Sequence, residues 1–380
     1  MKYVGIIAEY NPFHTGHARL LSAVKDADAV ICVMSGPFVQ RGEAAVLPPH
    51  ARAEMALAAG ADAVLELPFP YAASSARYFA TAGVRALAGV GVDTIAFGSE
   101  TGDLARLTVL AEKAPERVLR ESPERGDAAA YFDALGDAVS SNDILAVEYL
   151  RAIRKEAPFL TPFALKREGT PYSAIFNKGE YPSAAAIRAA LACGEDVVSL
   201  LHPETVEIFT AATEKYGLAD TARLGDAMLA FLRGGGASLA KGAKIAECGG
   251  GLLERLVRAA GNATDYASLC EGAATKRYTD GRIRRALLCL LAGVRASDLT
   301  AHPAYLRLLG ANARGREFLA ATARRRTVPV VTKPADIKAL GAAAERQRTL
   351  SLVADGLYAI AAGKGMLPHT LQTAAPVLKK

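Results

Sequence analysis

Residues 3–17 read YVGIIAEYNPFHTGH, an apolar run followed by a polar segment with two histidines, a proline and a glycine. The run YVGIIA has the length and composition of a buried β-strand, and the residues after it carry a helix-start signal, with Thr15 as the expected N-cap. His14 and His17 lie three positions apart, so both imidazoles can point to one spot beyond the end of the strand. The stretch therefore predicts a strand, a tight turn and a helix that begins beside two histidines.

A helix N-terminus at this point favours an anion, because its free N–H groups and its dipole are positive. Gly16 leaves room for a phosphate, and the two imidazoles can donate hydrogen bonds to charge that develops at an α-phosphorus when pyrophosphate is displaced. Pro12 stiffens the turn, while Glu9, Tyr10 and Asn11 are expected to border an acceptor substrate or a metal ion. We interpret the segment as a phosphate-reactive site.

Two other interpretations of the histidine pair stay open at this stage. A histidine near a helix start can simply cap the helix, and a four-residue pattern matches by chance at an appreciable rate. A zinc site is the second alternative, although a third ligand is not close in sequence, and His50 is only a distant candidate.

Apolar runs alternate with helical patterns through the first half of the chain. The expected strands are 3–8, 29–34, 63–68, 93–98 and 159–166, and helical spacing is found between them at 16–25, 51–59 and 74–87. This alternation predicts an α/β fold with a Rossmann-like parallel sheet. Ligands of such sheets bind at the carboxyl ends of the strands, which singles out EYNPFHTGH (9–17), SGPFVQRGE (35–43) and FGSETGD (97–103).

Strand signals fade after about residue 185, where alanine, leucine and arginine dominate and glycine triplets interrupt the pattern. We expect a mainly α-helical C-terminal domain, with residues 1–200 forming the nucleotide-binding domain and 201–380 the helical one. Between Lys276 and Arg326 there are twelve Lys or Arg and three acidic residues, whereas the whole chain has a net charge of +6. This basic segment favours binding to a polyanion such as RNA, or else forms a solvated arginine-rich helix face.

The composition narrows the class of protein. Hydrophobic residues make up 51% of the 380 positions and charged residues 22%, which is typical of a globular protein with a sizeable core. The five cysteines are scattered and never in CxxC spacing, so neither a disulfide framework nor a zinc knuckle is indicated. No apolar run has the roughly 18 residues of a membrane span and no signal peptide is evident, so we expect a cytoplasmic protein.

The strand–NPFHTGH–helix unit resembles the HxGH nucleotidyltransferase superfamily. Further blocks resemble the tRNA(Met) cytidine acetate ligase family: MSGPFVQRGE (34–43), RAEMAL (52–57), GADAVLELP (60–68), FGSE (97–100), SNDILAVEYL (141–150), KRYTDGRIRR (276–285) and YLRLLGAN (305–312). These blocks are spread over most of the chain, so the resemblance extends beyond a single motif.

The resemblance implies a ligase that uses ATP, with Mg²⁺, to convert acetate into acetyl-adenylate. The acetyl group would then pass to N4 of the wobble cytidine in the anticodon loop of elongator tRNA(Met), giving N4-acetylcytidine, with neither DNA nor a membrane as partner. The catalytic residues would be His14 and His17. By matching position, the nucleotide-binding residues would be Ile7, Ala8, Glu9, Tyr10, Asn11, Pro12, Phe13, His14, Thr15, Gly16, His17, Ala18, Arg19, Leu20, Gly98, Asn142 and Arg188.

The basic segment supplies the expected RNA-binding residues: Lys276, Arg277, Arg282, Arg284 and Arg285. Arg282 and Arg285 are three apart and are expected on one helix face, and Tyr278 could stack on a base. The alternative is that these arginines form ion pairs with acidic residues of the first domain.

Several other residues bear on the nucleotide. Arg188 would clamp the β and γ phosphates, Asn142 would bind a ribose or base unless it only caps a helix, and Arg41 could hold an anionic substrate or a tRNA phosphate. The chain departs from the family pattern at Ser141, where a proline is expected, and at Ala146, where a glycine is expected.

A third departure is Ala185, which stands in place of a threonine and lacks its hydroxyl. Two other functions stay under consideration, and the departures at Ala146 and Ala185 bear on the second of them. One is a small-molecule adenylyltransferase of the nicotinate mononucleotide or phosphopantetheine type. The other is a non-catalytic RNA-binding module that senses ATP.

Overall fold

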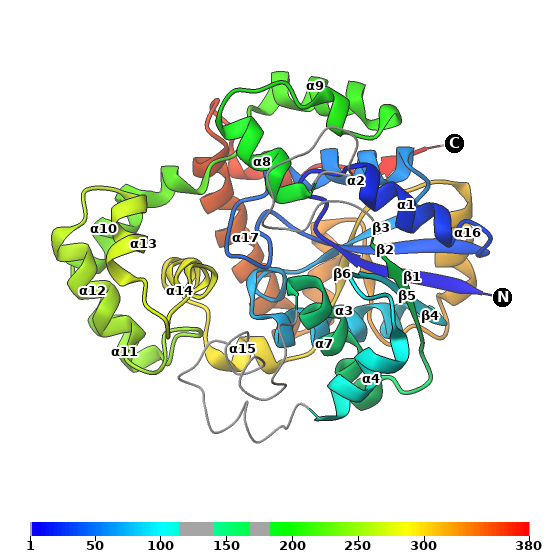
Figure 1. The fold of residues 1–380 in the computed structure, drawn as a ribbon, viewed down its shortest axis with the longest axis horizontal. Helices are drawn as coiled ribbons and strands as arrows, with labels where there is room; N and C mark the ends of the chain where they lie inside the picture. The colour runs from blue at the N-terminus through cyan, green and yellow to red at the C-terminus, as the bar shows by residue number, and fades with distance from the viewer. Residues whose placement is uncertain (1, 114–139, 168–182, 380) are drawn as a thin grey trace.

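The computed structural model describes residues 2–113, 140–167 and 183–379, and its centre is an eight-stranded sheet (Figure 1). The strand order is β5-β4-β1-β2-β3-β6-β7, with β8 beside β6. The strands are β1 (Tyr3–Ala8), β2 (Ala29–Ser35), β3 (Ala63–Leu67), β4 (Thr94–Ser99), β5 (Thr161–Lys166), β6 (Leu306–Ala311), β7 (Val330–Val331) and β8 (Val377–Leu378). The first five are parallel and lie within two residues of their expected positions, which confirms the Rossmann-like sheet.

Helices cover both faces of this sheet, which is why its central strands are apolar at nearly every position. On one face lie α3 (Ala76–Val90), α4 (Leu104–Lys113), α7 (Ser141–Glu156) and α16 (Ala313–Thr322). On the other face lie α1 (Thr15–Ala23), α2 (Pro49–Ala58), α8 (Ala184–Ala192) and α9 (Val206–Tyr216). Alternate residues of β2 serve the two cores: Ile31 and Val33 face the first set of helices, and Cys32 and Met34 face the second.

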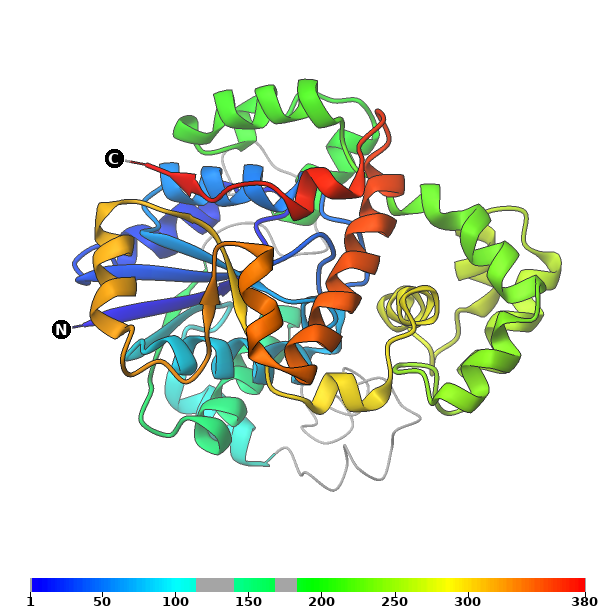
Figure 2. The same cartoon turned by 180° about the vertical axis from the view of Figure 1, so that it is seen from behind.

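A group of helices, here called the helical arm, extends to one side of the sheet (left in Figure 1). It consists of α10 (Gly225–Arg233), α11 (Gly236–Ala243), α12 (Leu252–Asn262), α13 (Tyr266–Ala273) and α14 (Asp280–Ala292). The arm has its own apolar core, which continues onto the long helix α17 (Ala342–Ala362). Figure 2 shows α17 between the arm and the sheet. The hydroxyl of Tyr358 on α17 donates to the Ala45 carbonyl at 2.8 Å, so this helix ties the arm to the loop after β2.

The chain after residue 200 is mainly helical, as expected, but it also contributes β6, β7 and β8 to the sheet, so the sheet does not end at residue 200. After the arm and the short helix α15 (Ala296–Thr300), the chain returns to the sheet, and β6 pairs antiparallel with β3. The remaining elements, α18 (Pro368–Gln372) and β8, end beside it. The sequence LRLLGA of β6 contains no β-branched or aromatic residue, so local propensity favours a helix and only pairing with β3 makes it a strand.

The ranges described contain no helix that is both long enough and apolar enough to cross a membrane.

The turn from β6 into α16 depends on close backbone contact with the start of β3. The Asn312 side chain caps α16 by accepting from the Gly315 N–H at 3.0 Å and donates through Nδ2 to Asp62 Oδ1 at 2.9 Å. A Cβ on Gly315 would lie only 2.0 Å from the Asp62 carbonyl oxygen. Because the obstacle is backbone, it cannot turn aside as a side chain would.

We therefore predict that Gly315→Ala lowers the free energy of unfolding by about 1–3 kcal/mol through overpacking. The matched control is Gly356→Ala in the interior of α17, where a Cβ would meet nothing within 4 Å. That change is expected to stabilise the protein by about 0.5–1 kcal/mol. Chemical denaturation of both variants tests the pair, and equal effects would contradict the tight contact at Gly315.

Candidate active site

A cleft of about 250 Å³ lies at the carboxyl ends of the parallel strands, where the sheet meets the helical arm. It is lined by the segment between β1 and α1 and by α1, by the segments after β2 and β5, and by α3, α7, α8 and α14. The lining residues are Glu9, His14, His17, Gln40, Arg41, Ala76, Ser141, Asn142, Ile144, Leu145, Arg167, Ser183, Ala184, Ala185, Arg188, Thr279 and Arg285. Of the three segments that the strand-end rule singled out, those after β1 and β2 line the cleft, whereas no residue of 97–103, after β4, does.

The two histidines lie against each other at the start of α1, with ring centroids 3.8 Å apart. His14, not Thr15, is the N-cap: its Nδ1 accepts from the Gly16 N–H at 3.0 Å, and His17 Nδ1 accepts in turn from the His14 N–H at 3.2 Å. A nitrogen that accepts carries no hydrogen, so in each neutral ring the proton is on Nε2. Capping and ligand binding are thus compatible, since each ring uses one nitrogen for the helix and keeps the other.

Both imidazoles are held neutral by their surroundings. Burial, followed by the nearby Arg167 and Arg188, lowers the pKa of His14 to about 3. Burial, followed by His14 and Arg167, lowers the pKa of His17 well below its usual value. At neutral pH the pair therefore offers two Nε2–H donors without positive charge.

The hydrophobic residues of the histidine segment support the rings from behind. Tyr10 and Phe13 are almost fully buried, and their rings lie 5.0 and 5.5 Å from that of His17. Of the continuous stretch 7–20 that sequence reasoning predicted for the nucleotide, only Glu9, His14 and His17 line the cleft. Tyr10 and Asn11 are buried and do not line the cleft.

Gly16 has a role that the sequence did not indicate. A Cβ at this position would lie 2.8 Å from Cε1 of His14, so the missing side chain makes room for the imidazole that caps the helix.

Four arginines and one glutamate contribute the charges of the cleft: Arg41, Arg167, Arg188, Arg285 and Glu9. The balance favours an anion with several charges, such as a polyphosphate. Arg167 directly follows β5 at the edge of the sheet, so the strand-end rule would have found it. Arg285 was predicted to bind RNA, but it lies in the cleft wall, with its Nε 3.4 Å from Glu247.

Glu43 connects Arg188 of α8 to Arg284 of the helical arm. One Glu43 oxygen lies 3.6 Å from Arg188 Nη2, and the other accepts from Arg284 Nη1 in a short ion pair. Arg188 Nη1 also donates to the Asn11 carbonyl at 2.9 Å. The interpretation in which arginines of the basic segment pair with acids of the first half therefore applies to Arg284.

A fully buried arginine joins the two segments that form the cleft. Arg52 of α2 is 0% exposed and donates to the carbonyls of Leu47 at 2.9 Å, Glu9 at 2.6 Å and Gly36. These bonds link the ends of β1 and β2. Arg52 belongs to the block RAEMAL, but no local signal in the sequence distinguished it from an exposed arginine.

Asn142 reaches the cleft from the first turn of α7. Ser140 caps this helix by accepting from the Asp143 N–H at 3.1 Å, so Asn142 is not the cap. The Asn142 amide instead donates to Glu100, which also accepts from Ser140. Gly98 does not line the cleft but lies next to Arg167, which does, since a Cβ there would be 3.3 Å from the Arg167 side chain.

The other predicted RNA-binding residues divide into an exposed and a buried pair. Lys276 and Arg277 are exposed in the loop before α14. Arg282 is 5% exposed and donates to the Gly249 carbonyl, and Tyr278 is 6% exposed with its hydroxyl bonded to Gly250. The expectation that Tyr278 stacks on a base is therefore wrong, because its ring lies inside the arm. Arg282 does not share an exposed face with Arg285.

Comparisons with known proteins agree with this arrangement. A family model described as HIGH Nucleotidyl Transferase matches residues 1–368. A tRNA(Met) cytidine acetate ligase of Syntrophotalea carbinolica is 38% identical over 87% of this chain and 85% of its own length, and one of Acetivibrio thermocellus is 34% identical over 94% of each. The chain belongs to the tRNA(Met) cytidine acetate ligase family. The family resemblance predicted from the sequence is thereby confirmed.

Solved structures of the family have the same fold. Apo TmcAL of Thermotoga maritima superposes with a TM-score of 0.89 at 28% identity, covering 100% of this chain and 99% of that one. The same protein bound with alpha-thio ATP superposes with a TM-score of 0.86 over the whole of both chains. The described part of our chain contains no group of three or more His, Cys, Asp or Glu placed to hold a metal, which leaves the zinc alternative without a ligand set.

The lowered pKa of His14 predicts a specific pH dependence of stability. Between pH about 6.5 and pH about 3 the unfolded chain binds a proton that the folded protein does not, so the free energy of unfolding falls as the pH falls through this window. His14→Asn keeps a capping acceptor and removes the titration. In this variant we expect the free energy of unfolding to fall less steeply as the pH falls, by up to about 1.4 kcal/mol per pH unit.

Denaturant unfolding at pH 7, 6 and 5 measures this slope. The control for the substitution itself is His302→Asn at an exposed position. Parallel slopes for the unmodified protein and His14→Asn would show that the folded imidazole takes up its proton normally.

Proposed function

We propose that this protein forms acetyl-adenylate and pyrophosphate from acetate and ATP, and transfers the acetyl group to N4 of the wobble cytidine of elongator tRNA(Met). The products of the second step are N4-acetylcytidine and AMP. The observation that carries the proposal is the pair of neutral Nε2–H donors at an arginine-rich cleft, in a chain of this family. A triphosphate fits both the donors and the charge.

In the first step an acetate oxygen attacks the α-phosphorus and the bond to pyrophosphate breaks. Both reactants are anions, so the protein has to align them and offset their repulsion. His14 and His17 would donate hydrogen bonds to the α-phosphate oxygens. Because both rings are neutral, they would hold the phosphate of the product less tightly than two cations would. Arg188 would hold the leaving phosphates as a planar two-pronged donor.

Mg²⁺ fits the cleft as an ion that arrives on the polyphosphate. Glu9 is the carboxylate that lines the cleft, and burial, opposed by the Gln40 N–H and by Arg188, raises its pKa. Mg²⁺ commonly uses one or two protein carboxylates besides phosphate oxygens and water. When bound, the ion would offset charge on the phosphates, and Glu9 would be the protein ligand.

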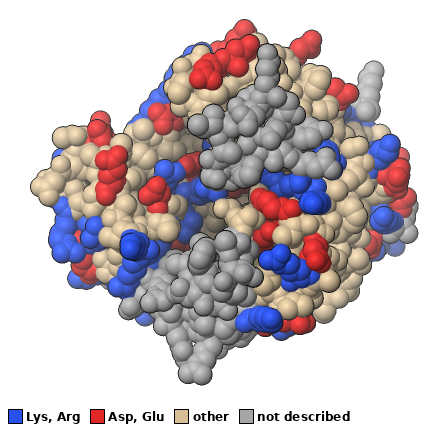
Figure 3. All heavy atoms as spheres, viewed as in Figure 1, with Lys and Arg blue, Asp and Glu red and all other residues tan. Residues whose placement is uncertain are grey.

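In the second step the cytosine amine attacks the acetyl carbonyl and AMP leaves. An anticodon loop offers unpaired bases, so little unstacking is needed. Helix α14 supports this step because Thr279 and Arg285 line the cleft while Lys276 and Arg277 are exposed just before it. Figure 3 shows Lys and Arg side chains on the arm and beside the central hollow. The RNA backbone would contact the loop while the target base enters the cleft.

Two departures from the family pattern differ in their consequences. Ala146 is 0% exposed in the core beneath α7, so it cannot contact a substrate. Ala185 lines the cleft, so the absence of a hydroxyl there concerns the phosphates directly.

The two steps predict separable defects. His17→Ala should abolish acetate-dependent exchange of labelled pyrophosphate into ATP while leaving tRNA affinity nearly unchanged, because the ring faces the cleft. Lys276→Glu with Arg277→Glu should leave exchange intact and weaken tRNA binding about tenfold or more, with a reduced dependence on salt. Exchange assays and tRNA titrations at two salt concentrations measure both effects.

The matched control is Arg258→Glu with Lys241→Glu, which changes exposed charges on the arm away from the cleft. Equal loss of exchange and tRNA binding in either test variant would refute the division of labour. A small-molecule adenylyltransferase would need another acceptor in place of acetate, and an ATP-sensing module would show no exchange at all.

Arg188 provides a test of phosphate binding alone. Arg188→Lys keeps the charge but loses the two-pronged donor, so we expect kcat/KM for ATP in the exchange reaction to fall about 10- to 100-fold. Retained activity would mean that Arg188 remains with Glu43 during catalysis. Glu43→Gln is the companion variant, because it removes the ion pair between Glu43 and Arg188 but keeps the guanidinium.

A further inference from the structure

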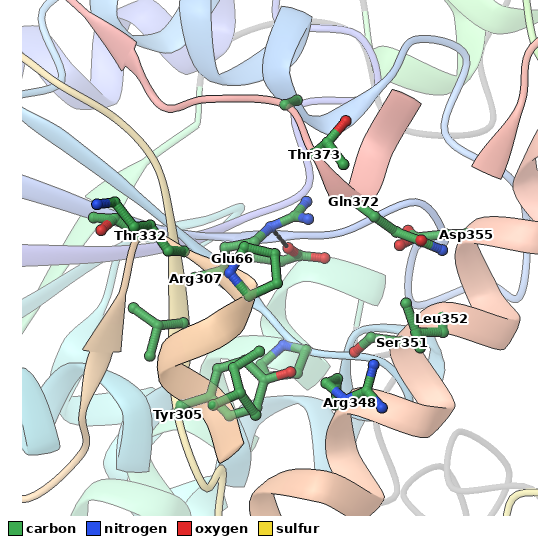
Figure 4. A pocket seen from close by; sticks show the side chains of 16 residues that line it. Glu66, Tyr305, Arg307, Thr332, Arg348, Ser351, Leu352, Asp355, Gln372 and Thr373 are labelled. Carbon is green, nitrogen blue, oxygen red and sulfur yellow. Dashed lines mark ion pairs between the residues drawn. The ribbon is translucent and has the colours of Figure 1, made fainter. Parts of the chain in front are cut away.

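A second cavity of about 240 Å³ lies beyond the ends of β3 and β6, and it shares no lining residue with the active site. Figure 4 shows it between β6, α17 and the segment that follows β7. This segment forms the short helix η5 (Pro334–Leu340). Nothing in the proposed reaction uses this cavity.

The floor of the cavity contains an arginine whose hydrogen-bonding capacity is not fully used. Arg307 Nε lies 2.8 Å from Glu66 Oε2, and its Nη1 donates to the Leu371 carbonyl at 3.0 Å. Its Nη2 is buried and has no hydrogen-bond partner in the described part of the chain. A buried guanidinium N–H without an acceptor is costly, so an acceptor that reached Nη2 from the cavity would lower that cost.

A second polar group faces the same space from α17. Asp355 is 4% exposed, and burial, followed by the nearby Glu66 carboxylate, raises the pKa of Asp355 to about 8. At neutral pH its carboxyl is therefore mainly protonated and can donate a hydrogen bond. Arg307 and Asp355 thus present two donors to one small region.

The walls of the cavity are largely apolar. Tyr305, Val331 and Ile337 are each 5–6% exposed, and Leu352 completes this side from α17. The volume is slightly below the range for drug-sized ligands, which is about 300–1,000 Å³. The space suits a compact organic molecule rather than a nucleotide.

Charge at the cavity favours an anion with one negative charge. Lys333 lies at the rim in addition to Arg307 and would repel a cation, whereas Arg348 at the rim is already paired with Glu345. Glu66 already lies against Arg307, so a second negative charge on the ligand would be repelled in turn.

We propose that this cavity binds a small monocarboxylate with an apolar body, its carboxylate on Arg307 and Asp355 and its body between Tyr305, Ile337 and Leu352. The same chemistry is found in simple carboxylic acids and in apolar amino acids. The two differ by an α-ammonium group, which Glu66 could accept.

Calorimetric titration of the full chain with hexanoate, norleucine and hexylamine tests the proposal. We expect hexanoate or norleucine to bind and hexylamine not to bind. Tighter binding of norleucine would indicate an amino acid, and tighter binding of hexanoate a simple acid. Binding of hexylamine alone, or of neither carboxylate at millimolar concentration, would overturn the proposal.

Variants then place the bound carboxylate in this cavity. Leu352→Trp fills the cavity, and Arg307→Lys removes the guanidinium while keeping the charge; each should weaken carboxylate binding about tenfold or more. Thr349→Trp adds the same bulk at an exposed position of the same helix and should leave binding within about twofold. His17→Ala should also leave it unchanged. Loss of binding in His17→Ala with retention in Leu352→Trp would instead place the carboxylate in the active site.

Discussion

The active site depends on how the first turn of α1 uses the two imidazoles. In each ring, Nδ1 accepts a hydrogen bond from a backbone N–H at the helix start. The proton of the neutral ring therefore lies on Nε2. The aromatic packing of Tyr10 and Phe13 and the space left by Gly16 hold the rings in that arrangement. A single local pattern therefore sets the helix boundary, the tautomer and the direction of the donors.

The surrounding cleft exists because several distant segments meet at one edge of the sheet. Arg52 secures the ends of β1 and β2 from inside, and Glu43 joins α8 to the helical arm from outside. The catalytic face of the sheet and the basic arm are thus parts of one surface, which suits a reaction that brings a nucleotide and a macromolecular substrate together.

The sequence predicted the parallel sheet, the histidine pair and the edge of the sheet that carries the site, because these depend on local patterns. It predicted poorly what depends on contacts between distant segments. Strand β6 has a helix-like composition and becomes a strand only against β3. Arg285 and Arg282 are equally basic in sequence, yet one lines the cleft and the other is buried in the arm, since packing decides where a side chain points. The strand-end rule, applied to β5, would have found Arg167.

The return of β6 to the sheet also affects biosynthesis. Asn312 bonds to a residue 250 positions earlier, so the edge of β3 stays unpaired until the ribosome has made most of the chain. An open apolar strand edge is a known route to aggregation in nascent proteins. The sheet therefore lacks its β6 neighbour on β3 until late in translation, and chaperone protection of the emerging β3 edge would be most valuable while the helical arm is being synthesised.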